Sequence, residues 1–193
     1  MVSNSGSIDV SSKNSNGGNI EVTGKEISIK SGSKLLASGK TGGGEVLIGG
    51  DWKGSGDLLQ STYTTVEKNT LIDASSTKSG DGGKIVVWSD IKNSKSKTSV
   101  NGSLFAYAID GNGGKIETSG ASVNTEKIKV NASSMNGNSG LWLVDPYDYT
   151  IGSQQASNIS STLSGGTSVT ILTTSQNINY GAGLTSNANG DIT

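Results

Sequence analysis

Two neighbouring carboxylates are the first candidates for chemistry in this sequence. Asp145 and Asp148 flank Pro146, and a pair of carboxylates can act as general acid and base on a glycosidic bond. The other interpretation is a turn fixed by Pro146, in which both aspartates accept hydrogen bonds from nearby backbone N–H groups. We favour the turn, because no third acid and no lysine cluster joins the pair.

The composition removes most other kinds of catalytic and metal site. The chain has no Cys and no His, so it can form neither a disulfide nor a thiolate zinc site, and no serine has a histidine to activate it. The segments 80–83 and 110–114 are similar to Gly- and Asp-rich repeats that bind Ca²⁺, but no nine-residue tandem follows them. We therefore expect structural turns there, no metal, no cofactor and no enzymatic activity.

The charged residues argue against a nucleic-acid partner. The formal net charge is −1 and every basic residue is Lys, so no basic stripe is available to neutralise phosphates. The lysines from Lys92 to Lys97 are interpreted as a solvated corner rather than a binding patch. Apolar runs such as Ile85–Trp88 and Leu141–Val144 have only four residues each, against about 20 for a helix that crosses a bilayer.

A repeated glycine pair precedes the strands that must position these residues. Each copy is a Gly-Gly step followed by an alternating apolar strand, and the last copy is reduced to Ser-Gly. The second glycine of the step recurs at intervals of 26, 39, 31 and 26 residues, at Gly18, Gly44, Gly83, Gly114 and Gly140. A repeat of this length with a strand signal in each copy is typical of a solenoid.

Each repeat carries three short strand signals. In the first full unit these are Ile20–Val22, Ile27–Ile29 and Leu35–Ala37, separated by polar corners. A narrow coil needs few apolar residues, which agrees with an apolar content of 31%. We predict an all-β fold, a right-handed parallel β-helix with three short strands per coil, and almost no helix.

We predict that residues 1–193 form a single β-helical section. Coils that start with a glycine step fill 1–145, and coils without that start continue through 146–193. The last five residues, Asn189–Thr193, are typical of a strand that is cut off as it begins. We therefore expect the chain to be an internal piece of a longer protein.

Two tryptophans are the candidate contacts for a ligand. If alternate residues of each strand point inward, the outward positions carry an apolar set made of Leu47, Val86, Trp88, Trp142 and Val144, interrupted by Glu117. We favour the interpretation that an insertion within 49–65, which explains the 39-residue interval, folds over this set. The alternative is an exposed platform on which Trp88 and Trp142 stack against a glycan or a partner protein.

Several segments, in order, resemble one protein family. Gly140–Ile151 resembles the Gly-x-Trp-Leu-x-Asp-Pro segment of exoproteins from two-partner secretion systems, the filamentous-haemagglutinin-like adhesins. Gly82–Asp90 and Gly42–Gly50 resemble glycine-stepped units that lie upstream in those proteins, and 165–170 with 189–193 resembles the stretch that follows. The resemblance spans most of residues 40–193.

The resemblance implies a secreted protein at the surface of a Gram-negative bacterium. It implies a right-handed parallel β-helix, exported by the outer-membrane transporter of a two-partner secretion system. The absence of Cys would suit passage of an unfolded chain through a narrow pore. The secretion domain of the family is not recognisable in this sequence.

The first functional hypothesis is a segment of an adhesin shaft that mediates attachment to host cells, surfaces or other bacteria through an unknown glycan or protein ligand. The second is a polysaccharide-processing enzyme on the same scaffold. Two aspartates stacked on one face with a lysine beside them would favour the enzyme. The third is the shaft of a contact-dependent toxin or haemolysin.

Overall fold

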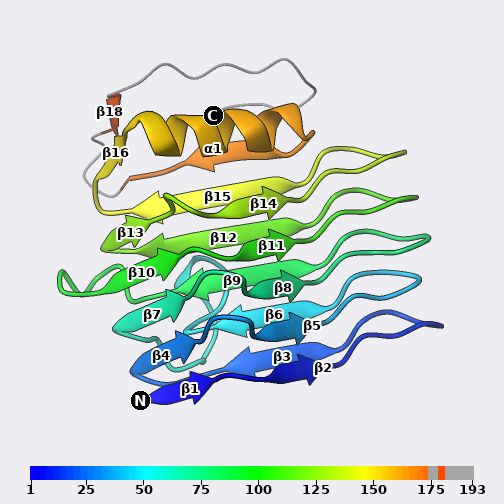
Figure 1. The fold of residues 1–193 in the computed structure, drawn as a ribbon, viewed down its shortest axis with the longest axis horizontal. Coiled ribbons are helices and arrows are strands. Elements are labelled where there is room, and N and C mark those ends of the chain that lie inside the picture. Colours follow the sequence, from blue (N-terminus) through cyan, green and yellow to red (C-terminus); the bar gives the residue numbers. More distant parts are fainter. Residues whose placement is uncertain (174–177, 181–193) are drawn as a thin grey trace.

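The backbone winds into a stack of coils, each built from three short strands (Figure 1). The computed structural model describes residues 1–173 and 178–180. Within these residues the fold is a parallel β-helix with three strands per coil, which confirms the fold predicted from the glycine-stepped repeat. The strand expected to begin at 189–193 lies outside the described residues.

Three sheets run along the stack, and strands of successive coils pair in parallel within each sheet. Sheet 1 contains, in order, β1 (Val2–Asn4), β4 (Glu26–Ile29), β7 (Tyr63–Val66), β10 (Lys97–Val100) and β13 (Ser122–Asn124). Sheet 2 contains β2 (Ser7–Asp9), β5 (Lys34–Leu36), β8 (Leu71–Asp73), β11 (Ser103–Phe105) and β14 (Lys129–Asn131). Sheet 3 contains β3 (Asn19–Val22), β6 (Glu45–Ile48), β9 (Lys84–Trp88), β12 (Lys115–Gly120), β15 (Leu141–Pro146) and β17 (Ser168–Ile171). We number coils one to five by the strands β3, β6, β9, β12 and β15 that end them.

Apolar side chains stack in columns inside the coils. The main inward column of sheet 3 is paired in register from coil to coil and runs through Ile20, Val46, Ile85, Ile116, Trp142 and Val169. Sheet 2 adds a column of Leu35, Ile72 and Leu104. All of these side chains are buried, and each contributes roughly 1.5–3 kcal/mol. Aligned columns therefore give a continuous core with few apolar residues per coil.

The glycine steps lie where the backbones of successive coils are in close contact. A Cβ atom on Gly43 would overlap the carbonyl oxygen of Ala74 in the next coil, and one on Gly44 would overlap the carbonyl oxygen of Gly18 in the previous coil. The backbone N–H of Gly44 also donates a 2.8 Å hydrogen bond to the carbonyl of Ala37. The same bond recurs at 2.8 Å from Gly83, Gly114 and Gly140 to Ala74, Ala106 and Ala132. The repeat is thus a steric requirement of the stack.

One helix corrects the expectation of almost no helix. Helix α1 (Ser153–Ser164) follows β16 (Tyr149–Ile151), which pairs with β18 (Ile178–Tyr180). Its buried apolar residues Ala156, Ile159 and Leu163 are spaced three and four apart, so they share one helix face. This face covers the core at the end of the stack (Figure 1). In the described part of the chain, no helix is long and apolar enough to span a membrane.

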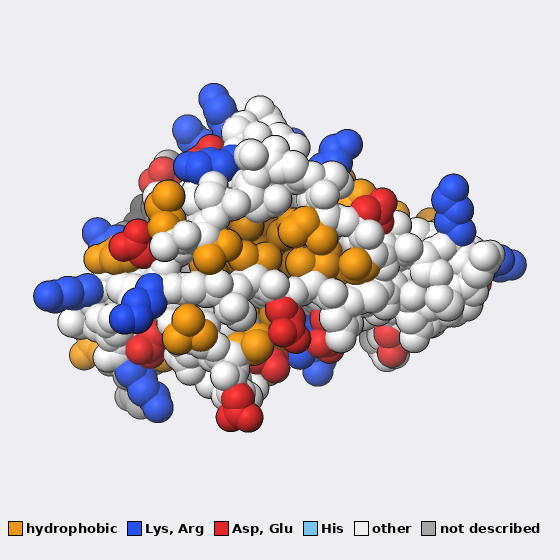
Figure 2. Space-filling view, turned by 90° about the horizontal axis from the view of Figure 1, so that it is seen from below, with side chains coloured by type: hydrophobic (Ala, Val, Ile, Leu, Met, Phe, Trp, Pro, Cys, Tyr) orange, Lys and Arg blue, Asp and Glu red, His pale blue; other side chains and the backbone are white. Residues whose placement is uncertain are grey.

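The two ends of the described stack differ. At the N-terminal end, β1, β2 and β3 are the outermost strands of their sheets. Figure 2 views this end and shows apolar side chains gathered on it. Met1 is 89% exposed, and Val2 and Ile8 are each 37% exposed. The core is therefore covered by α1 at one end and partly open at the other.

Candidate functional site: the covered outer face of sheet 3

A long connection between two strands covers part of the outer face of sheet 3. Residues 49–62 join β6 to β7, whereas only residues 23–25 join β3 to β4. This connection, which we call the strap, contains the short 3-10 helix η1 (Trp52–Gly54). Its position confirms the insertion that the 39-residue interval predicted.

The strap covers an apolar cluster that is separate from the main core. Leu47, Val86 and Trp88 are buried there, and Trp52 and Leu58 of the strap pack against them, together with Ile91. The predicted outward direction of Trp88 is confirmed, and so is the interpretation that the insertion covers it. The ring is only 2% exposed, and its Nε1–H donates a 3.1 Å hydrogen bond to Oε1 of Gln60 in the strap.

Close contact with the Trp88 ring explains why two positions of the strap are glycine. A Cβ atom on Gly50 would come within 2.5 Å of Cδ1 of the ring, and one on Gly54 within 2.6 Å of Cζ2. Gly54 also has a φ of +64°, in the left-handed region that favours glycine. The strap therefore lies directly on the indole.

The predicted outward direction of Trp142 and Val144 is wrong. Trp142 pairs with Ile116 and belongs to the inward column, where it is fully buried and its Nε1–H donates to Oγ1 of Thr118 at 3.1 Å. Leu143 takes the outward position instead, opposite Glu117. In coils two to four the inward residue is the second after the glycine step, and counting from Gly140 in the same way would have placed Trp142 correctly.

Neither tryptophan presents a ring face to a ligand in this conformation. Stacking on a sugar requires an exposed aromatic face, whereas Trp88 lies under the strap and Trp142 lies inside the coils. The exposed platform suggested for Trp88 and Trp142 is therefore not present on this surface.

A buried acid lies beside the apolar cluster and was missed as a site by the sequence analysis. Glu117 on β12 points outward yet is fully buried. Its Oε2 accepts a 2.8 Å hydrogen bond from the backbone N–H of Lys53, and its Oε1 accepts one of 2.7 Å from the hydroxyl of Ser119. A charged residue that interrupts an apolar outward column was the only signal of it in the sequence.

Burial changes the acidity of Glu117. Loss of solvation raises its pKa from the ordinary value of 4.5 to about 7, although the hydrogen bonds from Lys53 and Ser119 oppose the rise. The negative charge of Asp145 raises the pKa further, and the charge of Lys53 lowers it. Burial also raises the pKa of Asp145, against the effect of Lys53. Glu117, on the neighbouring strand β12, is thus the acid whose pKa responds to the charge of Asp145.

An ion pair fixes the start of the strap. The ammonium of Lys84 on β9 lies 2.9 Å from Oδ1 of Asp51 and 3.4 Å from Oε1 of Glu45. Burial alone would raise the pKa of Asp51, but the hydrogen bonds from Lys84 and from the backbone N–H of Trp52 lower it overall. The Trp52 ring in turn lies 5.8 Å from the ammonium of Lys115, within the range of a cation–π contact.

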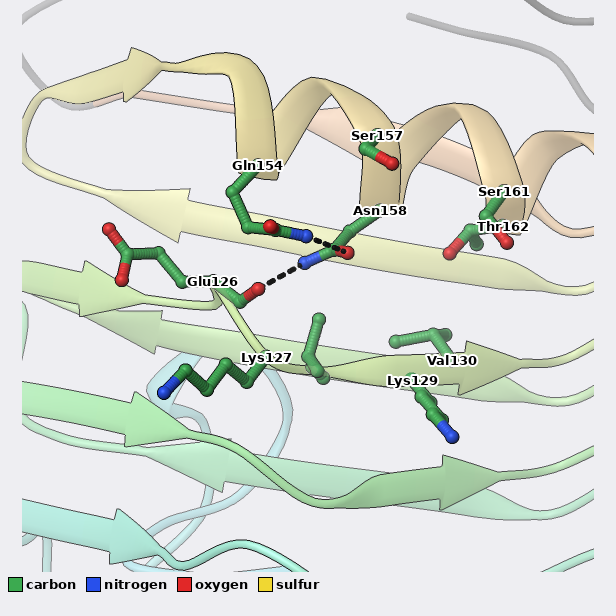
Figure 3. Close-up of a pocket in the computed structure, with 10 residues that line it drawn as sticks. Glu126, Lys127, Lys129, Val130, Gln154, Ser157, Asn158, Ser161 and Thr162 are labelled. Atoms are coloured by element: carbon green, nitrogen blue, oxygen red, sulfur yellow. Dashed lines mark hydrogen bonds between the residues drawn. The ribbon is translucent and has the colours of Figure 1, made fainter.

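A polar hollow lies under α1 at the covered end of the stack (Figure 3). Its volume is about 480 Å³, and its walls come from α1 and from residues 126–130. Nδ2 of Asn158 donates to the backbone carbonyls of Thr125 and Glu126 at 2.9 and 2.8 Å, and Nε2 of Gln154 donates to Oδ1 of Asn158 at 3.2 Å. These bonds attach the helix to the corner of coil five.

Comparison with known proteins assigns the chain to no family. No protein-family model matches the chain, and no curated protein matches it. Function is therefore argued from the fold and from the arrangement of side chains described above.

Proposed function

We propose that the chain is a segment of a surface-exposed adhesin shaft, secreted by a Gram-negative bacterium and without catalysis of its own. The observation that carries the proposal is the register of the three parallel sheets, which forms a regular stack with long rows of outward side chains. A stack of this kind offers extended faces to a partner and contacts between neighbouring coils for stiffness.

The route to the surface is part of the same proposal. Its support is the order of the segments Gly42–Gly50, Gly82–Asp90 and Gly140–Ile151, which resemble exoproteins of two-partner secretion. The chain has no Cys, so no disulfide would have to form or be reduced before an unfolded chain passes an outer-membrane transporter.

An attachment assay tests the proposed function. Beads coated with the 193-residue chain should attach to epithelial or bacterial cells more than beads coated with Ile85→Asp, which places a charge in the inward column of sheet 3. Circular dichroism would verify that the parent is folded and the variant is not. Equal attachment of the two bead types, or none above bare beads, contradicts the proposal.

One arrangement favours a polysaccharide-processing enzyme as the second candidate. Glu117 and Asp145 lie on neighbouring strands of one face with Lys53 beside them, which is close to the pattern expected for that class. In this conformation, however, Glu117 is fully buried beneath the strap, so a substrate does not reach it. We expect no new reducing ends when the chain is incubated with polygalacturonate. Release of reducing ends by the parent, and not by Glu117→Gln, would make the enzyme the better proposal.

A further inference from the structure

A difference in corner length creates a notch between sheets 1 and 2. Four residues join these sheets in coil three (67–70) and in coil five (125–128), but only two join them in coil four (101–102). The shorter corner of coil four is recessed between the corners of coils three and five, and it leaves two adjoining hollows of about 270 and 210 Å³. We call these two hollows the notch.

The floor of the notch requires a residue without a side chain. Gly102 is buried there, and a Cβ atom at this position would come within 2.9 Å of the carbonyl oxygen of Thr70. Asn101 and Ser103 flank it and also line the notch. The floor therefore offers the amide of Asn101 and the hydroxyl of Ser103.

Three lysines form the walls of the notch. Lys68 comes from the corner of coil three, and Lys127 and Lys129 come from the corner of coil five and the start of β14. All three are exposed, and none of them forms an ion pair within residues 1–173. Figure 3 shows the side chains of Lys127 and Lys129 extending away from α1, on the side of coil four.

The acidic residues nearby do not cancel this charge. Glu67 lines the larger hollow, but it is paired with Lys30, whose ammonium lies 3.0 Å from its Oε1, and this pairing lowers the pKa of Glu67. The carboxylate of Glu126 points away from the ammonium of Lys129 (Figure 3). The notch is thus a cationic hollow on a protein whose net charge is −1.

We propose that the notch binds an acidic polysaccharide through its carboxylate or sulfate groups, an assignment that rests on the proposed surface-binding function. The ammonium groups would pair with the anions, while Asn69, Asn101 and Ser103 would hydrogen-bond to sugar hydroxyls. Lys68 and Lys127 are two coils apart, roughly 10 Å by the spacing of paired strands, which suits charged groups on alternate sugars of an extended chain. The hollow is lined by amides, a hydroxyl and lysines, so it can hydrogen-bond to sugar hydroxyls but has no apolar pocket for the side chains of an acidic peptide.

Two charge-matched triple variants test the proposal. One variant carries Lys68→Gln, Lys127→Gln and Lys129→Gln. The control carries Lys92→Gln, Lys95→Gln and Lys97→Gln, which removes the same charge from the exposed corner before β10 and from the first residue of that strand. Binding of polygalacturonate (carboxylate) and dextran sulfate (sulfate) is measured by titration calorimetry, with neutral dextran as the blank. We expect the notch variant to raise the Kd at least about tenfold and the control to change it less than about twofold.

Each outcome has a defined meaning. The ratio of the two Kd values shows whether carboxylate or sulfate is preferred. Equal losses in both triple variants, or absence of binding by the parent, would overturn the notch. So would binding of polyglutamate or polyphosphate as tight as that of the polysaccharides, since this would assign the notch to peptides or phosphates. The adhesin proposal fails alone if coated beads do not attach to cells while polygalacturonate still binds the notch. The notch proposal fails alone if coated beads attach to cells and the notch variant binds the polysaccharides as well as the parent does.

Discussion

The backbone N–H of Lys53 donates a 2.8 Å hydrogen bond to Oε2 of Glu117, which lies 64 residues further along the chain. This bond connects the strap to a buried carboxyl group on coil four. The strap inserted after coil two therefore contacts a strand two coils away, and it does so through an acid whose charge depends on pH near neutrality.

The first prediction concerns the dependence of stability on pH. Native Glu117 keeps its proton up to about pH 7, whereas in the unfolded chain it loses the proton near pH 4.5. The native state binds more protons between these values, so the free energy of unfolding should fall as pH rises through this range, by about 3 kcal/mol in total. Denaturant titrations at pH 5 to 8 of the parent and of Glu117→Gln measure the effect. The variant should lack this decline.

Other acids change stability in the opposite direction and at lower pH. The pKa of Asp51 and that of Glu67 are lowered in the fold, so their contributions are complete above their unfolded values and are lost only on acidification. The effects of Asp51 and Glu67 therefore lie below the window from pH 5 to 8. Asp145, whose pKa is also raised, acts in the same direction as Glu117, so the comparison with Glu117→Gln is what assigns the decline to Glu117. Parallel curves for the parent and Glu117→Gln across this window would contradict the assignment.

The second prediction concerns the glycine steps. Gly44→Ala places a Cβ atom onto the carbonyl oxygen of Gly18, and backbone atoms cannot move aside as a side chain can. We expect a loss of at least about 3 kcal/mol in the free energy of unfolding. Gly6→Ala is the matched control, because nothing lies within 4 Å of its added Cβ atom. If both variants unfold at the same denaturant concentration, the steric account of the repeat is wrong.

The third prediction concerns the cluster under the strap. Trp88→Ala removes a ring that is 2% exposed, and such a truncation costs about 3–5 kcal/mol. The strap should also become sensitive to limited proteolysis, since residues 49–62 lose the surface on which they pack. Trp52→Ala, which removes a less buried ring from the same cluster, should cost clearly less. Cleavage of the strap at the same rate in the parent and in Trp88→Ala would contradict this role.

The glycine step and the period-two pattern predicted the sheets, the columns and the place of the strap. They did not predict α1, because Ala156, Ile159 and Leu163 stand among Ser, Thr and Asn, a composition that resembles the strands of the earlier coils. The period-two pattern placed Trp142 on the wrong face: Trp142 is the second residue after Gly140 and takes the inward position of Ile85 and Ile116.

The contact between Lys53 and Glu117 could not be predicted from the sequence. It involves a backbone N–H group in an irregular segment, and no residue type indicates such a bond across 64 positions. The notch depends on a two-residue difference between corners, which becomes visible only when strand ends are known. Repeats define the coils, whereas the sites arise where coils depart from the repeat.

The fourth prediction concerns the helix at the end of the stack. Ile159→Ala leaves a cavity between α1 and the core, where Ile159 is fully buried, and should cost about 2–5 kcal/mol. Ser157→Ala on the exposed side of the same helix should change stability by less than about 0.5 kcal/mol. Thermal unfolding followed by circular dichroism compares the two. Similar midpoints would mean that α1 does not seal the core.

The glycine contacts reach only from one coil to the next, and this has a consequence for evolution. Deleting or duplicating a whole winding outside coils two to four, which the strap connects, would leave each glycine step with a partner of the same shape, because the joints are alike. The length of such a molecule can therefore differ between lineages by whole windings, without compensating substitutions in its interior.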